Sequence, residues 1–185
     1  MKWLAICILL TSACFSQQQL RGAYGVEFGA SKTAVQRIAK AGWWIPEKTD
    51  NPKLLVYTVA KGKGVTRLEF RFVDERLSSI TSLIREKECC HVMREYARLV
   101  NSLTLQHGKP SSRRAFDGAV TWGDERDVDE VKAGRAEISD VWRLPSSDPD
   151  VFSVVHTAIN ANGEISAKYQ QRGLVIVTVP RFNYP

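Results

Sequence analysis

Hydrophobic residues fall at helical spacing in two places along this chain. In the first, the apolar positions are Val35, Ile38 and Ala39, with Ser31 before them and Gly42 after them. Serine accepts a hydrogen bond from the backbone at a helix start, and glycine tolerates the backbone conformation at a helix end. The pattern therefore predicts a helix between Ser31 and Gly42, with a narrow apolar face for packing on a sheet.

A second helix is predicted from about Glu88 to His107. Its apolar stripe recurs every three or four residues and consists of Val92, Tyr96, Leu99, Val100 and Leu103. Gly108 and Pro110 follow, and both residue types are common just after a helix. His107 is placed where a positive charge would favour the helix dipole.

Between these helices the pattern alternates with a period of two, which is typical of a strand with one covered face. Leu68, Phe70 and Phe72 alternate with Arg67, Glu69 and Arg71. Further β-rich runs at 54–60 and 77–84 flank this segment across short turns. Three such strands in succession predict an antiparallel meander. A short strand is also expected at 24–28, before the first helix.

The second half of the chain is predicted to be mostly strand. Candidate strands occupy 119–122, 136–143, 151–159, 164–171 and 174–179. The sequence Asn160-Ala161-Asn162-Gly163 favours a hairpin, because asparagine and glycine tolerate positive φ. The charged stretch 124–132 is expected to be a loop. Together the patterns predict a single α+β domain over 20–185, with an antiparallel sheet (a meander) and two helices packed on one face.

The first sixteen residues have the layout of a secretory signal. Lys2 gives a positive start, residues 3–10 form a continuous apolar run, and Ser16 offers a place for a peptidase to cut. The apolar run is too short for a membrane-spanning helix. Residues 1–16 are therefore predicted to be a signal peptide, and the domain is expected in the periplasm or outside the cell.

Cys14 provides an alternative end for the signal peptide. Thr11-Ser12-Ala13-Cys14 is similar to a bacterial lipobox, in which the signal ends at Ala13 and the cysteine is lipidated; that motif usually has leucine where this chain has Thr11. Acylation would hold the domain at a membrane surface, since each buried methylene contributes roughly 0.8 kcal/mol. A lipid anchor at Cys14 is the one membrane attachment that we expect.

Composition fits a globular domain without a nucleic-acid partner. Hydrophobic residues make up 44% of the chain, and the formal net charge is +6. This surplus is small and scattered, with no basic tract of the kind that follows a phosphate backbone. We therefore expect no nucleic acid as a partner.

Beyond the signal the sequence has only two cysteines, Cys89 and Cys90. Neighbouring cysteines in a helix do not readily form a disulfide, and no CxxC metal pattern is present. One buried and one partly exposed thiol is one interpretation, and a vicinal disulfide or an intermolecular bridge is the other. Because a helix start lowers the pKa of a thiol and His91 follows, Cys89 and Cys90 are a candidate thiol site.

The titratable residues predict no catalytic residue, no cofactor and no metal site. His91, His107 and His156 are the only histidines in the sequence. The first two would lie roughly 24 Å apart on one helix, too far to share a metal ion. The acidic stretch 124–130 contains an arginine and lacks the glycine of a calcium-binding loop. No metalloprotease, nucleophile-elbow or phosphate-loop motif occurs.

Trp43 and Trp44 are a candidate binding surface. Neighbouring residues of an extended segment point to opposite sides, so both rings cannot face the core. An exposed tryptophan beside Pro46 suits contact with a protein or a glycan. A bent loop that packs both rings in the core is the alternative interpretation.

Two short motifs resemble those of small exported bacterial proteins. They are Tyr24-Gly25-Val26-Glu27-Phe28-Gly29-Ala30-Ser31-Lys32, a strand-glycine-helix start, and His107-Gly108-Lys109-Pro110, a helix end. Over residues 22–110 the chain thus resembles uncharacterised α+β domains of envelope proteins and lipoproteins. The helix start is also similar to that of the small outer-membrane assembly lipoproteins of the SmpA/OmlA type, whose two-helix-then-sheet order this chain lacks. The resemblance implies an envelope location and supplies no catalytic residue.

These observations favour a non-enzymatic envelope protein that binds or scaffolds another, unknown envelope protein. The alternatives are a secreted hydrolase or thiol enzyme with an unfamiliar site, and a carrier of small apolar ligands. A deep pocket that joins His156, Cys90 and an acidic residue would favour the enzyme. A flat sheet with an exposed Trp43 or Trp44 would favour the binding protein.

Overall fold

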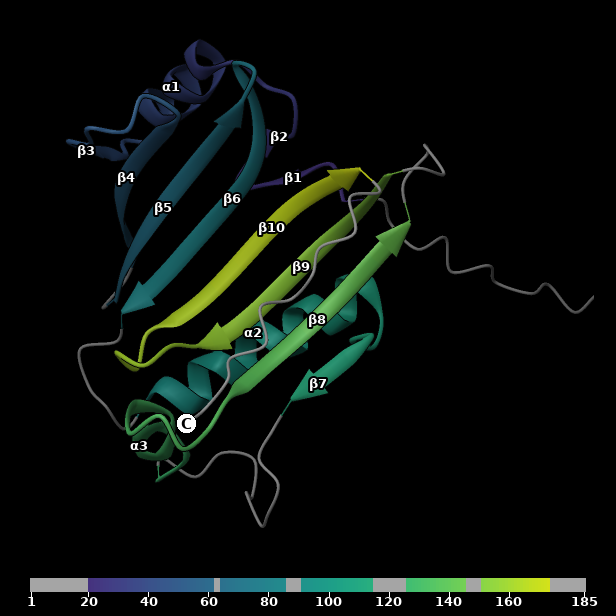
Figure 1. Cartoon of the computed structure of the whole chain (residues 1–185). Coiled ribbons are helices and arrows are strands. Elements are labelled where there is room, and N and C mark those ends of the chain that lie inside the picture. Colours follow the sequence, from purple (N-terminus) through teal and green to yellow (C-terminus); the bar gives the residue numbers. More distant parts are fainter. Residues whose placement is uncertain (1–19, 62–63, 86–90, 115–125, 146–150, 174–185) are drawn as a thin grey trace, which may run out of the picture.

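The computed structural model describes residues 20–61, 64–85, 91–114, 126–145 and 151–173. They form an antiparallel sheet of eight strands with helices beside it (Figure 1), so the fold is α+β. The helices are α1 (Lys32–Ala41), α2 (Val92–His107) and α3 (Arg126–Lys132). The strands of the sheet are β3 (Ile45–Glu47), β4 (Leu54–Lys61), β5 (Gly64–Val73), β6 (Arg76–Arg85), β7 (Ser112–Arg114), β8 (Ile138–Pro145), β9 (Val151–Ile159) and β10 (Ile165–Gly173). A separate pair, β1 (Gly22–Ala23) and β2 (Val26–Glu27), precedes α1.

The large sheet consists of two runs of four strands that meet at β6 and β10. Its order is β3-β4-β5-β6-β10-β9-β8-β7, so each run is a meander (Figure 1). The antiparallel β6–β10 pair joins the runs and aligns Ile84 with Ile165. The meander predicted for the first three long strands is confirmed, but it does not continue across the sheet, because β10 rather than β7 pairs with β6.

Alternation along the strands puts apolar side chains on one face of the sheet. The register aligns Phe70 of β5 with Ile80 of β6, and Ile80 in turn with Tyr169 of β10. All three belong to one core cluster, which also contains buried residues of α1 and α2. Arg67 and Glu69 alternate with the buried positions of β5 and form an ion pair with each other.

The helix α1 begins and ends as the sequence predicts. The Ser31 hydroxyl oxygen accepts a hydrogen bond from the Ala34 N–H at 3.3 Å, and the Gly42 N–H donates to the Ile38 carbonyl at 2.9 Å. These bonds satisfy backbone groups that helix ends leave without a helical partner. Val35 and Ala39 are buried in the core cluster, so the predicted apolar face is the one that packs.

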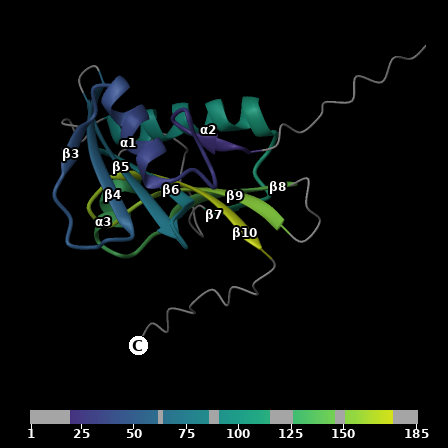
Figure 2. The same cartoon turned by 90° about the horizontal axis from the view of Figure 1, so that it is seen from above.

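The helix α2 ends at His107, as predicted, while the expected start at Glu88 lies outside the described residues. Gly108 follows with a φ of 80°, and its N–H donates to the Thr104 carbonyl. Figure 2 shows α2 along one face of the sheet, where it contacts β8, β9 and β10. Its buried residues are Val92, Met93, Tyr96, Val100, Leu103 and His107.

The strand predicted at 24–28 is confirmed only at β2, because Tyr24 and Gly25 form the turn of a hairpin and Phe28 lies in the turn that follows. Tyr24 and Gly25 have φ angles of 56° and 75° and turn the chain between β1 and β2. The Tyr24 ring packs edge-on against Tyr169, with 6.1 Å between the ring centroids. Tyr169 is far from Tyr24 in the sequence, and the contact between the two rings compensates for a backbone conformation that tyrosine rarely adopts.

The charged loop predicted at 124–132 is also wrong over its described part, which forms α3. Val128 and Val131 are three positions apart and both are buried in the core cluster. The predicted hairpin is confirmed: the Asn160 side-chain oxygen accepts hydrogen bonds from the N–H groups of Asn162 and Glu164, each at 2.9 Å.

Several predictions fall on residues outside the described ranges. They are the signal peptide 1–16, Cys14, Cys89, Cys90, and the strands 119–122 and 174–179. Within the described ranges, no helix is both long enough and apolar enough to cross a membrane.

Candidate functional site

The loop between α1 and β3 places Trp43 and Trp44, the predicted binding surface, in different environments. The Trp44 ring stacks on Phe70, with 5.7 Å between centroids and 14° between the planes, and meets Tyr57 at 5.9 Å. A Cβ atom on Gly42 would lie 2.7 Å from the Trp44 indole nitrogen, so glycine is needed for this close approach. Trp44 therefore closes the core at this end of the sheet.

Trp43 points away from the core. The residue is 90% exposed, and its φ is 57°, in the left-handed region. That conformation costs a bulky residue about 1–3 kcal/mol unless its surroundings compensate. A ring that is almost entirely in solvent gains little burial energy in return. The folded chain thus holds a large apolar ring outward at a cost to its stability.

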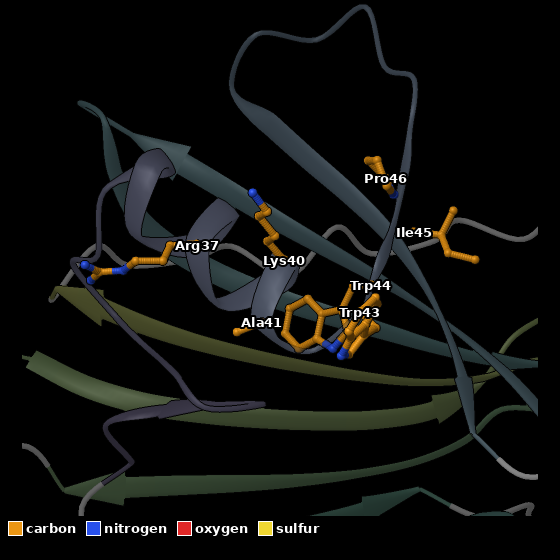
Figure 3. A pocket seen from close by; sticks show the side chains of 7 residues that line it. All are labelled: Arg37, Lys40, Ala41, Trp43, Trp44, Ile45 and Pro46. Atoms are coloured by element: carbon orange, nitrogen blue, oxygen red, sulfur yellow. The ribbon is translucent and has the colours of Figure 1, made fainter.

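The surroundings of Trp43 form a surface pocket of about 750 Å³. Its lining residues, called here the Trp43 surface, are Arg37, Lys40, Ala41, Trp43, Trp44, Ile45 and Pro46. The first three come from α1 and the last two from β3, and Figure 3 shows the lining residues around the end of the helix. Ile45 is 61% exposed. The pocket is open to solvent; its wall is almost entirely apolar, and two cations border it.

The charge of the Trp43 surface is positive. None of its seven lining residues is acidic, and Arg37 and Lys40 are both exposed. The nearest carboxylate along β3, that of Glu47, accepts hydrogen bonds from Thr58 and Arg67. These bonds hold the pKa of Glu47 below its ordinary value. Glu47 is therefore committed to partners on β4 and β5.

A buried polar cluster, not foreseen from the sequence, lies between α2 and the second run of strands. The Tyr96 hydroxyl donates to Asp140 at 3.0 Å and lies 3.3 Å from the Thr157 hydroxyl. Arg113 of β7 donates to the other Asp140 oxygen at 2.6 Å. Asp140 stands at an inward position of β8, between Ile138 and Trp142, and that break in an apolar alternation is the signal that could have found it.

The hydrogen bonds of this cluster have a structural role. Burial, together with the neighbouring Asp140 carboxylate, raises the pKa of Tyr96 well above its ordinary value. Tyr96 therefore stays protonated and acts as a donor to the carboxylate. Asp140 and Thr157 are both fully buried, and so neither of these two residues reaches the surface, whereas the Arg113 side chain does.

The histidines do not come together. His91 precedes α2 and His107 ends it, while His156 lies on β9 beside the inward-facing Thr157. His107 is buried, its Nδ1 has no hydrogen-bond partner among the described residues, and burial lowers its pKa. In the described part of the chain, no group of three or more histidine, cysteine, aspartate or glutamate residues is arranged to hold a metal ion.

Comparisons with known proteins add no family to this geometry. No protein-family model, no curated protein and no solved structure matches the chain.

Proposed function

We propose that this chain is an exported envelope protein that binds another protein through the Trp43 surface. The observation that carries the proposal is the outward Trp43, 90% exposed in a left-handed backbone conformation. Selection for stability alone would favour glycine or asparagine at such a position. Tryptophan is among the residues that contribute most to protein interfaces, because it buries a large rigid area at small entropic cost.

The fold supports this role. We propose that α1 and α2 cover the same face of the sheet, since their buried residues share one core cluster with it. The loop that carries Trp43 then connects the end of α1 to β3, the edge strand of the sheet, and both elements hold it in place. A site fixed between a helix and a strand loses little entropy on binding.

Export is the second part of the proposal. Residues 1–16 would be removed as a signal, or Cys14 would become a lipidated N-terminus that keeps the domain at a membrane. Mass spectrometry of the mature N-terminus separates these outcomes. A start at Gln17 without lipid would remove the anchor, and an intact residue 1 would remove export.

Site-specific photocrosslinking tests the binding surface. A photoreactive phenylalanine analogue replaces Trp43 in the full chain, expressed in its native cells, and the control variant carries it at Leu105. Leu105 is a similarly exposed apolar residue on α2, with an exposed fraction of 89%. We expect a discrete protein adduct from position 43 that is missing from position 105. Equal patterns at both positions, or no adduct at position 43, would contradict the proposal.

The variant Trp43→Asn separates binding from folding. Asparagine tolerates the left-handed region, so the free energy of unfolding should stay unchanged or rise by about 0.5–1 kcal/mol. Partner binding should fall, because the ring is lost. Denaturant unfolding checks the first expectation and recovery of the crosslinked partner by affinity capture checks the second. A clear loss of stability would show that Trp43 serves the fold.

A further inference from the structure

We infer that the partner presents an acidic segment with a bulky apolar side chain, and that Arg37 and Lys40 pair with its carboxylates while Trp43 packs on the apolar group. This inference rests on the proposed function and specifies the chemistry of the partner. It is drawn from the charges and the shape of the Trp43 surface.

The two cations border the same pocket. Arg37 and Lys40 are three positions apart on α1 and both line it, with their charged ends pointing to different sides and away from the indoles (Figure 3). Among the described residues, neither has a carboxylate oxygen within 4.0 Å. By contrast Lys32, at the start of the same helix, pairs with Glu75 at 3.1 Å. The end of α1 therefore has two cations available for carboxylates of a partner.

The backbone at the end of α1 does not cancel this charge. The N–H groups of Gly42, Trp43 and Trp44 donate to the carbonyls of Ile38, Lys40 and Ala39. These bonds satisfy carbonyl groups that would otherwise carry the negative end of the helix dipole. A carboxylate approaching Arg37 and Lys40 thus meets a net positive surface.

The edge strand β3 favours recognition by side chains over addition of a strand. β3 has three residues, and Pro46 in its centre has no N–H to donate. A strand added at this edge could not form a continuous ladder of hydrogen bonds. Contacts to the Trp43 ring and to the two cations are what remains, and arginine suits carboxylates because it donates two parallel hydrogen bonds.

An anionic lipid surface also matches positive charge and a tryptophan, but the shape favours a protein segment. The pocket lies between a helix and a strand and is lined from both sides (Figure 3). A side chain of a folded or extended partner can rest in such a shallow, open hollow, whereas a bilayer interface buries apolar groups that protrude from a surface. The membrane is therefore the competing outcome of the test.

Selection from a library of random short peptides tests the inference. The full chain is used as bait, Trp43→Asn is used for counter-selection, and enriched peptides are synthesised and titrated by fluorescence polarisation. We expect peptides in which a bulky apolar residue stands beside two or more Asp or Glu residues. The double variant Arg37→Glu/Lys40→Glu should weaken their binding by about tenfold or more, and added salt should weaken binding to the unchanged chain.

The matched control is Arg94→Glu/Lys109→Glu, which changes net charge equally at exposed positions near α2. It should bind the peptides as the unchanged chain does. Trp43-dependent peptides without acidic residues, or binding that survives Arg37→Glu/Lys40→Glu, would overturn the inference and leave the proposed function standing. If no selected peptide depends on Trp43, both fail. Binding of phosphatidylglycerol vesicles that needs Arg37, Lys40 and Trp43, without peptide binding, would overturn the inference in favour of a membrane.

Discussion

The strand runs β3–β6 and β7–β10 have the same arrangement of helix, loop and edge strand, but different residues fill the core beside each run. In each, a helix ends at a glycine, and a short loop leads into an edge strand, β3 after α1 and β7 after α2. Beside α1 the core closes with the aromatic contacts of Trp44, Tyr57 and Phe70. Beside α2 it contains the carboxylate of Asp140, which is not exposed to solvent at all.

The difference shows two ways to hold an edge strand. Aromatic rings need only close packing, so the edge of the first run is held by the complementary shapes of its rings. A buried carboxylate needs donors, and these come from Arg113 on β7 and Tyr96 on α2. In the second run, the Asp140 side chain therefore connects both the edge strand β7 and the helix α2 to the sheet. The first run has no such polar connection, and its loop holds Trp43 outward.

The largest expected effect is on the aromatic side of the comparison. Phe70 is fully buried and lies between Trp44 and Tyr57, so Phe70→Ala should lower the free energy of unfolding by about 3–5 kcal/mol. Urea denaturation measures the change. Leu105→Ala is the control, because Leu105 is exposed and its loss should stay within about 0.5 kcal/mol. Equal effects of the two substitutions would mean that the stack does not close the core.

A smaller loss is expected on the polar side. Arg113→Met leaves the Asp140 carboxylate buried without its ion-pair partner and should cost about 2–4 kcal/mol, at the low end because the Arg113 side chain is 43% exposed. Adding Asp140→Asn removes the buried charge and should restore part of the stability. Unfolding of both single variants and the double variant gives the coupling energy, and strict additivity would argue against the pair.

The smallest effect concerns the buried His107. Its pKa is lowered by burial, so the unfolded chain takes up a proton at a higher pH than the folded chain does. The stabilising effect is present above the ordinary histidine pKa of about 6.5 and is lost as the pH falls below it. His107→Leu should flatten this part of the stability profile. His91→Leu is the control at a less buried histidine, and an unchanged slope in His107→Leu would contradict the assignment.

Local chemistry explains why the sequence predicted some elements correctly. The bounds of α1 depend on Ser31 and Gly42, which act on groups a few positions away, and the hairpin at Asn160 depends on hydrogen bonds within four residues. The turn at Tyr24 was missed because its support comes from Tyr169, far along the chain. The helix α3 was missed because its charged residues outnumber the two valines through which it packs in the core.

The candidate site was foreseen only in part. The pair Trp43 and Trp44 could be singled out because neighbouring bulky residues in one segment cannot both face a core. Which ring is exposed could not be read from the sequence, since that depends on Phe70 and Tyr57 lying beneath the loop. The cations were part of a helix predicted correctly, but their place beside the indoles follows from the turn at Gly42.

By itself the sequence determined local elements of this protein: the helix α1 with both of its caps, the glycine end of α2, alternating strands and a hairpin, since these depend on contacts between near neighbours. Only the tertiary structure decided that β10 joins β6, that Asp140 is buried against Tyr96 and Arg113, and that Trp44 enters the core while Trp43 does not. Each of these outcomes requires residues from distant parts of the chain to meet, and their energies exist only once the sheet has formed. The pocket and its positive charge belong to that second group.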